Sequence, residues 1–337
     1  MATVSIYELT RLAALALQRA GAAVSSAQAT AAALVSADMQ GLTSNGVSRI
    51  PQYVAFLSNN WNSRCASPRV VRSKGGSCLI DAQSGMAYEA CALAVRTAIG
   101  RAREYGVGCT GVTNSKHFGA ASVHLDLVGR AGLIGLAFSK PRMTMLGWNG
   151  RTLLFGTNPV SAIFPRQSAE PLVFDLTLSD ATRGRVMQAA KERWSVANGA
   201  PVNRVFEATS SVEAALAGGM LPAPAMDEAV LSLIVELLAG AHAGAVFASE
   251  AESVFTDVGN QANLGQLFVT IDPTMLPGAS LFFLRNELLF DMKLQAPASH
   301  IPSSRRQSLS RTAEKCGVLV PDTLYQHLCT LAGESCD

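Results

Sequence analysis

The chain has 337 residues, of which 49% are hydrophobic and 15% charged, and its formal net charge is +2. This length allows a large buried core, and the composition is typical of a globular protein. Lysine and arginine form no basic stripe, which argues against nucleic-acid binding. Glu8 and Arg11 interrupt any signal-peptide pattern, and the apolar segment 229–247 contains Glu236 and His242. We therefore expect a cytoplasmic protein in which that segment is a buried helix and not a membrane span.

The seven cysteines are widely spaced and contain no C-x-x-C pair. An odd number at such spacing argues against a disulfide framework and against a zinc site. We expect reduced thiols and no metal centre, with Cys91 and Cys109 as small core residues.

Hydrophobic periodicity and turn residues predict the elements in chain order. In the first part they are helices over 5–40 broken near Gly21, a short helix over 51–59, two strands within 70–83 and a helix over 88–105 ending at Gly106. Further strands are expected at 109–113, 134–138, 160–164, 172–176 and 267–271, and helices at 122–131, 180–195, 227–248 and 321–331. Residues 195–225 are expected to be irregular, and the polar segment 302–311 to be a loop.

This mixture predicts an α/β fold with two parts. Residues 1–70 together with 300–337 are expected to form a helical domain built from both termini. Residues 71–299 are expected to form the α/β domain, with a mixed sheet.

One glycine pattern, Gly106 to Gly111, matches G-x-G-x-x-G but is expected to bind no dinucleotide. A dinucleotide fingerprint needs a strand before the glycines and a helix after them, so that the helix N-terminus meets the pyrophosphate. Here the predicted order is reversed, and the glycines are expected to cap a helix and form a turn. A Rossmann fold is therefore not supported.

A polar turn between two predicted helices carries the first candidate site. It places Ser44, Asn45 and Arg49 near one another, and the planar guanidinium of Arg49 is suited to a carboxylate. The alternative is structural: Ser44 would cap a helix, and Arg49 would lie on the surface.

The second candidate is the segment Ser115–Ala121, in which His117 stands beside an aromatic ring and small residues. Small residues allow a flat ligand to approach the backbone, and a histidine can move a proton near neutral pH. His117 could equally be an ordinary core or surface histidine. His124 is expected to be structural.

The third candidate combines the Gly156–Pro159 turn with the segment Asp175–Arg185. Thr177, Ser179, Arg183 and Arg185 offer hydrogen-bond donors to anionic oxygens. Each piece is also compatible with an ordinary turn or helix cap.

Together these pieces resemble the malate/L-lactate dehydrogenase family that is unrelated to the Rossmann enzymes. This family includes ureidoglycolate and sulfolactate dehydrogenases and piperideine/pyrroline-2-carboxylate reductases. The resemblance covers about residues 5–330, and its pieces are Gly41–Tyr53, Ser115–Ala121, Gly156–Pro159, Asp175–Arg185, Leu231–Gly240 and Asn263–Gln266.

The resemblance implies a homodimer, a non-Rossmann domain that binds NADH or NADPH, and a small-molecule carboxylate as substrate. It implies that Arg49 holds the substrate carboxylate, and that His117 is an acid/base group in some members and a cofactor-site residue in others. The cofactor residues it implies are Ser139, Asp175, Leu176, Thr177 and Arg185.

The chain departs from the family at two positions. Ser44-Asn45-Gly46 stands where the family has Ser-His-Gly, and Asn45 cannot supply a proton at neutral pH. Asp227 stands where the family has a lysine, which puts an anion in place of a cation near the cofactor or substrate.

These observations lead to two hypotheses. In the first, the chain is an NAD(P)H-dependent reductase of a small 2-oxo or cyclic 2-imino carboxylate, in which His117, or a water held by Ser44 and Asn45, handles the proton. The missing acid favours the imine, which can already carry its proton. In the second, the chain is a diverged member without redox activity: it catalyses proton transfer, hydration or elimination on a carboxylate, or only binds one.

Overall fold

The protein is described by a computed structural model. The described residues are 1–141, 145–146, 153–167, 169–178, 186, 201–203, 207, 209–220, 226–246, 263–294 and 303–335. Within these ranges no helix combines the length and the hydropathy needed to cross a bilayer.

A seven-stranded sheet lies at the centre of the α/β part, with the order β2-β3-β4-β12-β5-β8-β9. In that order the strands are Arg69–Lys74, Ser77–Asp81, Val107–Ser115, Leu264–Ile271, Ile134–Lys140, Val160–Phe164 and Leu172–Leu176. Within this sheet β3 and β4 run parallel, and every other neighbouring pair is antiparallel. A Rossmann sheet is mostly parallel, so the expectation of a non-Rossmann α/β fold is confirmed.

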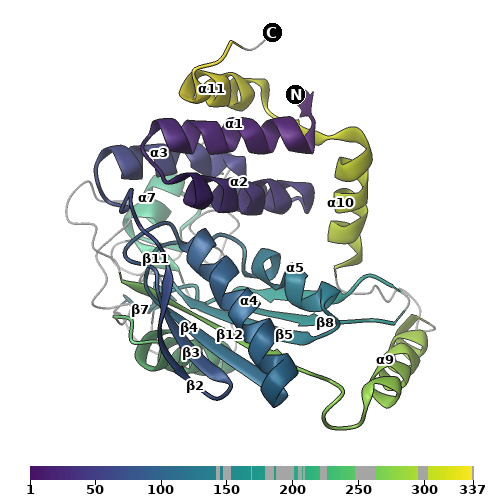
Figure 1. Cartoon of the computed structure of the whole chain (residues 1–337). Coiled ribbons are helices and arrows are strands. Elements are labelled where there is room, and N and C mark those ends of the chain that lie inside the picture. Colours follow the sequence, from purple (N-terminus) through teal and green to yellow (C-terminus); the bar gives the residue numbers. More distant parts are fainter. Residues whose placement is uncertain are drawn as a thin grey trace.

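Helices α4 (Ala87–Tyr105) and α5 (Ala121–Arg130) pack on the sheet (Figure 1). The alanine-rich side of α4 is buried together with Ile80, Val112 and Phe268. The helix ends at Gly106, whose φ is +81°, and β4 follows at once. A Cβ at Gly108 would lie 2.0 Å from the Ala98 carbonyl oxygen, so this glycine is needed for close packing. The G-x-G-x-x-G pattern is therefore a helix cap and a turn, as predicted.

A second helical segment packs on β5 and β12. It consists of α8 (Met226–Val235), which continues as a π-helix over Glu236–His242. A Cβ at Gly265 in β12 would lie 1.7 Å from the Ala239 carbonyl oxygen. The glycine therefore permits the close approach of the π-helix to the sheet.

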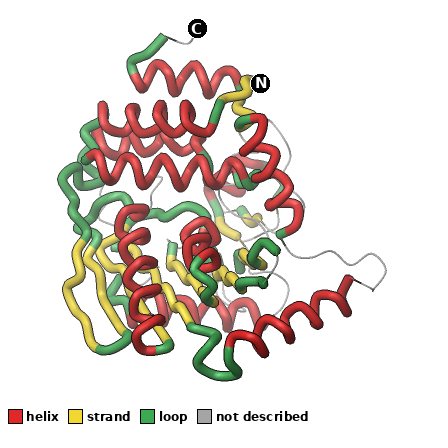
Figure 2. Tube along the Cα trace, turned by 45° about the vertical axis from the view of Figure 1, so that its right-hand side comes forward, coloured by secondary structure: helices red, strands yellow, loops and turns green. Residues whose placement is uncertain are grey.

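The two ends of the chain build a helical layer above the sheet, and Figures 1 and 2 show both termini on that side. Its elements are α1 (Ile6–Arg19), α2 (Val24–Met39), α3 (Ile50–Ser58), α10 (Ser304–Cys316), α11 (Asp322–Ala332) and the antiparallel pair β1 (Ala2–Val4) with β13 (Val318–Val320). Leu9, Leu34, Ile50 and Leu328 share one buried cluster. On this packing we base the proposed division of the chain into two domains. The helical domain consists of residues 1–70 with 300–337, and the α/β domain of residues 71–299.

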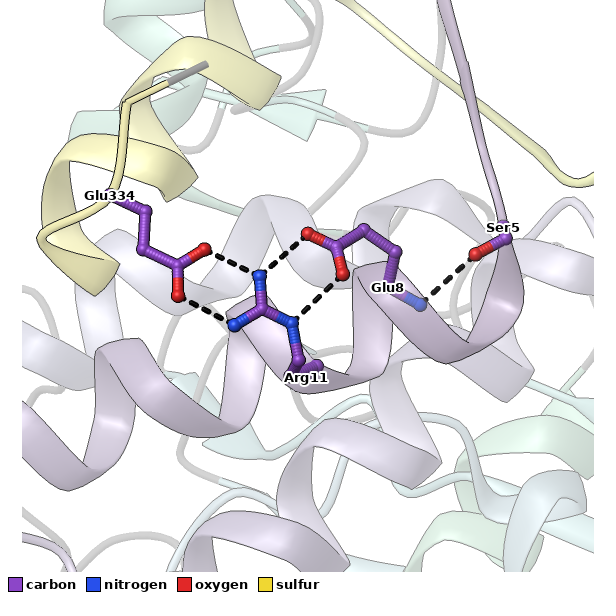
Figure 3. Close-up of polar contacts among 4 residues, drawn as sticks. All are labelled: Ser5, Glu8, Arg11 and Glu334. Atoms are coloured by element: carbon purple, nitrogen blue, oxygen red, sulfur yellow. Dashed lines mark hydrogen bonds and ion pairs between the residues drawn. The ribbon is translucent and has the colours of Figure 1, made fainter. Parts of the chain in front are cut away.

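A surface network ties α1 to the end of α11 (Figure 3). Ser5 caps α1 by accepting the Glu8 N–H at 3.1 Å, and Arg11 donates to Glu8 at 2.8 Å and to Glu334 at 2.5 Å. The two carboxylates raise the pKa of Arg11. Since these side chains lie at the surface, where water and salt screen their charges, the network stabilises the fold only modestly.

The structure differs from the predicted elements in several places. Residues 302–311 were expected to be a loop, yet α10 begins at Ser304; this helix is polar, and Ala313 is its one fully buried apolar residue. The sequence pattern also missed β1, β13 and α9 (Ala279–Leu294). The segment 195–225 contains β10 (Pro201–Val202), α7 (Val212–Ala217) and β11 (Gly219–Met220). Most of the helix expected at 180–195 lies outside the described residues.

Five cysteines, Cys65, Cys78, Cys91, Cys109 and Cys316, are free thiols. Cys91 is fully buried, as expected, and Cys109 is half-buried. The expectation of reduced thiols throughout is wrong for Cys329, which is disulfide-bonded.

Candidate active site

The turn between α2 and α3 consists of two 3-10 turns, Thr43–Asn45 and Val47–Arg49, joined at Gly46. The Asp38 carboxylate accepts the Val47 N–H at 2.7 Å. A Cβ at Gly46 would lie 1.9 Å from Asp38 Oδ1, so this close approach requires glycine. Burial raises the pKa of Asp38 to about 7. The hydrogen bond from Val47 lowers this pKa, but by less than burial raises it.

This turn orients Arg49. Its Nε donates to the Ser44 carbonyl oxygen at 2.7 Å, and Nη1 donates to Gln52 Oε1 at 3.1 Å. Nη2 and the side chains of Ser44 and Asn45 make no hydrogen bond within the described part of the chain. The half-buried guanidinium therefore keeps donors for an anionic ligand.

His117 lies in the loop between β4 and α5, and Tyr53 of α3 connects it to the Arg49 turn. The Tyr53 hydroxyl is 2.9 Å from His117 Nδ1 and 3.0 Å from the Tyr88 hydroxyl. Arg49 is the N-cap residue of α3, and Tyr53 lies four positions further along, about one helical turn away. The first two predicted sites are therefore adjacent in space. Neither tyrosine was predicted as a site residue, although the spacing from Arg49 to Tyr53 was a usable signal.

The charge state of His117 follows from its surroundings. Burial, with the nearby charge of Arg49 and with His124, lowers the pKa of His117 to about 3, so the imidazole is neutral at pH 7. His124 donates from Nε2 to the Phe118 carbonyl oxygen at 2.7 Å and stacks on the Phe118 ring at 5.0 Å. Its pKa is lowered to about 4, mainly by burial. His124 is therefore structural, as predicted.

The described residues implied at the cofactor lie on two strands of the central sheet: Ser139 on β5, and Asp175 and Leu176 on β9, which Thr177 follows directly. Ser139 is buried in β5, and its Oγ lies 3.5 Å from the Gly265 carbonyl oxygen. Asp175 in β9 accepts the Ser122 hydroxyl at 2.8 Å and Arg306 at 3.1 Å, and burial raises its pKa. Leu176 and Thr177 are exposed at the end of β9.

The Gly156–Pro159 turn is anchored to α8. Asn158, whose φ is +36°, donates to the Ser232 carbonyl oxygen at 2.8 Å and to Glu236 at 3.4 Å. Lys140 Nζ lies 3.8 Å from Glu236 Oε1, and both side chains are buried. This ion pair was not predicted from the sequence, because Lys140 and Glu236 are 96 positions apart.

Two buried polar atoms close to His117 lack a hydrogen-bond partner among the described residues: Ser115 Oγ and Gln266 Oε1. Gln266 pairs in register with Ser139 and donates to the Lys116 carbonyl oxygen at 3.2 Å. A nicotinamide carboxamide carries both a donor and an acceptor, which matches this set. The residues present therefore fit a nicotinamide cofactor.

Ser179, Arg183 and Arg185 lie outside the described residues. Asp227 belongs to the first turn of α8, but its side chain is likewise outside what the structure describes.

Comparison with known proteins agrees with this layout. The family model described as malate/L-lactate dehydrogenase matches residues 4–329. The (2R)-3-sulfolactate dehydrogenase (NADP(+)) of Chromohalobacter salexigens is 35% identical over 308 residues, which cover 91% of this chain and 92% of that protein. A Δ1-pyrroline-2-carboxylate/Δ1-piperideine-2-carboxylate reductase of Pseudomonas aeruginosa is 30% identical, with 98% and 99% covered. The crystal structure of Δ1-piperideine-2-carboxylate reductase from Pseudomonas syringae superposes with a TM-score of 0.92 at 29% identity, covering 98% of this chain and 100% of that one.

Proposed function

Because the chain belongs to the malate/L-lactate dehydrogenase family and is an NAD(P)-dependent oxidoreductase, we propose that it reduces a small 2-oxo or cyclic 2-imino carboxylate, with preference for the imine. The observation that carries this preference is the absence of a cationic acid among the candidate catalytic residues. Asn45 does not ionise, and His117 is neutral beside Arg49.

In this proposal Arg49 binds the substrate carboxylate with the donors that the Ser44 and Gln52 contacts leave open. The nicotinamide, when bound, supplies the hydride to the carbon next to that carboxylate. Ser115, Ser139 and Gln266 hold the carboxamide, and Asp175, Leu176, Thr177 and Arg185 lie along the rest of the cofactor. Ser44 and Asn45 hold a water or the reacting polar atom.

The preference for an imine follows from where the proton comes from. A ketone becomes an alkoxide as hydride arrives and needs a proton at that moment, and an acid group in place is worth about 10²–10⁴ in rate. A cyclic imine near neutral pH already carries its proton and needs none from a side chain. Relatives named as pyrroline- and piperideine-2-carboxylate reductases support the same substrate class.

The test is an assay of NADPH and NADH oxidation with matched carboxylates. A cyclic imine-2-carboxylate should be reduced with a higher kcat/KM than pyruvate, oxaloacetate or 3-sulfopyruvate. Faster reduction of any of these keto acids would overturn the preference for imines. Fluorescence titration with each cofactor tests the non-redox alternative, which requires that neither binds at millimolar concentration.

A homodimer is also proposed, and α9 supports it. This helix projects from the body of the molecule (Figures 1 and 2). Its leucines Leu281, Leu284, Leu288 and Leu289 are 45–55% exposed. Apolar patches of this kind on soluble proteins mark interaction surfaces.

Light scattering after size-exclusion chromatography tests this assembly. Replacing Leu284 and Leu288 by Glu should convert a dimer into a monomer. Replacing Leu127, an exposed leucine on α5, should leave the mass unchanged. A monomeric wild-type protein would exclude the homodimer. A cytoplasmic location is proposed as well, because five of the six described cysteines are free thiols; the sixth, Cys329, is disulfide-bonded.

A further inference from the structure

Three side chains from separate elements form a continuous hydrogen-bonded chain. Tyr88 of α4 contacts Tyr53 of α3 at 3.0 Å between hydroxyl oxygens, and Tyr53 contacts Nδ1 of His117 at 2.9 Å. Both tyrosines are 3% exposed. The end of this chain is the imidazole of His117, which feels the charge of Arg49 in the candidate active site.

The direction of the hydrogen bonds can be worked out from the number of protons. Burial raises the pKa of both tyrosines, so each hydroxyl keeps its one proton. Among the described residues, the only acceptor within reach of the Tyr88 hydroxyl is Tyr53. If Tyr53 donated to Tyr88 instead, a buried O–H of Tyr88 would lack an acceptor, at a cost of about 1–3 kcal/mol. Tyr88 therefore donates to Tyr53, and the Tyr53 proton points to Nδ1.

The backbone at Gly119 holds Tyr88 in this position. Gly119 has φ of +74°, and a Cβ there would lie 2.7 Å from the Tyr88 hydroxyl oxygen. The loop that carries His117 thus closes directly over Tyr88. The small residues around His117 serve the packing of the tyrosine as well as access to the histidine.

We propose that Tyr88 and Tyr53 are positioning residues that hold His117 as the tautomer with an unprotonated Nδ1 and a proton on Nε2. A neutral imidazole held in this way donates a hydrogen bond through Nε2 and cannot act there as a base. The role of His117 toward the substrate rests on the proposed reductase function. In that reductase, His117 donates this hydrogen bond to an oxygen atom of the carboxylate substrate. Its role is to orient and polarise the substrate rather than to remove a proton from it.

Imidazole ¹⁵N NMR of the full-length protein tests the tautomer without any need for turnover. The chain has five histidines, and comparison with a His117→Gln variant identifies the signals of His117. In the wild type, Nδ1 should show the shift of an unprotonated nitrogen and Nε2 that of a protonated one between pH 6 and 8. In Tyr53→Phe the two tautomers should both be populated, and Tyr88→Phe should produce a smaller change in the same direction.

Tyr7→Phe is the matched control, because Tyr7 is 78% exposed, and it should leave the His117 signals unchanged. A protonated Nδ1 in the wild type would overturn the proposal, and so would wild-type shifts in Tyr53→Phe. Kinetics then test the role of His117 toward the substrate: Tyr53→Phe should lower kcat about 10- to 100-fold with a smaller change in KM. If no cofactor is oxidised at all, the proposed function fails while the NMR result still decides the tautomer.

Discussion

Arg306 of α10 donates to Asp175 Oδ2 of β9 at 3.1 Å, which joins the C-terminal helical segment to the edge strand of the central sheet. Arg306 lowers the pKa of Asp175, opposing the stronger effect of burial. Arg306→Gln should therefore destabilise the fold by about 1–2 kcal/mol at pH 7 and weaken cofactor binding. Urea unfolding and fluorescence titration measure the two effects. Arg305→Gln, at an exposed neighbouring position, is the control, and equal losses in both variants would contradict the role of this contact.

Gly46 should not tolerate a side chain. Gly46→Ala places a Cβ 1.9 Å from Asp38 Oδ1, so the turn or the carboxylate must move, at a cost of about 1–3 kcal/mol. Because this turn orients Arg49, KM for the carboxylate should rise as well. Gly100→Ala is the control: Gly100 lies in α4 with open space around it, and the change should be neutral or stabilising by up to about 1 kcal/mol. Full activity and stability in Gly46→Ala would show that the turn adapts.

Asp38 should make stability depend on pH. Its pKa is about 7 in the folded protein, and the unfolded chain has a value near 4. The native state therefore binds the proton more tightly, and the stability contributed by this group is present below pH 4 and lost as pH rises to 7. Asp38→Asn should reduce this fall. Urea unfolding from pH 4.5 to 8 measures how the free energy of unfolding falls with pH. The same pH dependence in wild type and variant would rule out Asp38 as its cause.

Arg49→Ala should separate substrate binding from cofactor binding. Loss of the guanidinium should raise KM for the carboxylate by about 10- to 150-fold, the range expected when a charged hydrogen bond is removed. Arg49→Lys should recover only part of this, since an ammonium cannot bind both carboxylate oxygens. The Kd of NADPH, followed by fluorescence, should change little. Arg96→Ala, on the exposed side of α4, provides the control, and an unchanged KM in Arg49→Ala would remove Arg49 from the site.

Asn45→His should increase keto-acid reduction more than imine reduction. An ionisable imidazole at this position could supply the proton that an alkoxide needs, an effect worth up to about 10²–10⁴ in rate. The ratio of kcat/KM for the two substrate classes is the measurement. Asn45→Gln keeps an amide donor and should leave the ratio near that of the wild type. If both variants behave alike, proton supply does not limit ketone reduction.

Much of this protein could be predicted from the sequence because the relevant signals are local. Apolar periodicity predicted α1, α4 and α5 and most of the sheet strands, and the order of helix and strand around Gly106 excluded a dinucleotide loop. The chemistry of the Arg49 and His117 side chains also marked both residues as candidates before their proximity in the fold was known. Amphipathic patterns and capping glycines depend on residues within a few positions of one another, so the chain alone carries them.

The tertiary structure decided what depends on groups far apart in the chain. The bond from Tyr53 to His117 spans 64 positions and that from Arg306 to Asp175 spans 131, and no periodicity encodes either. α10 was missed for a related reason: it is polar, and its contacts with α2 and with Asp175 form only in the folded protein. The neutral state of His117 likewise arises from burial and from the charge of Arg49, which act through space.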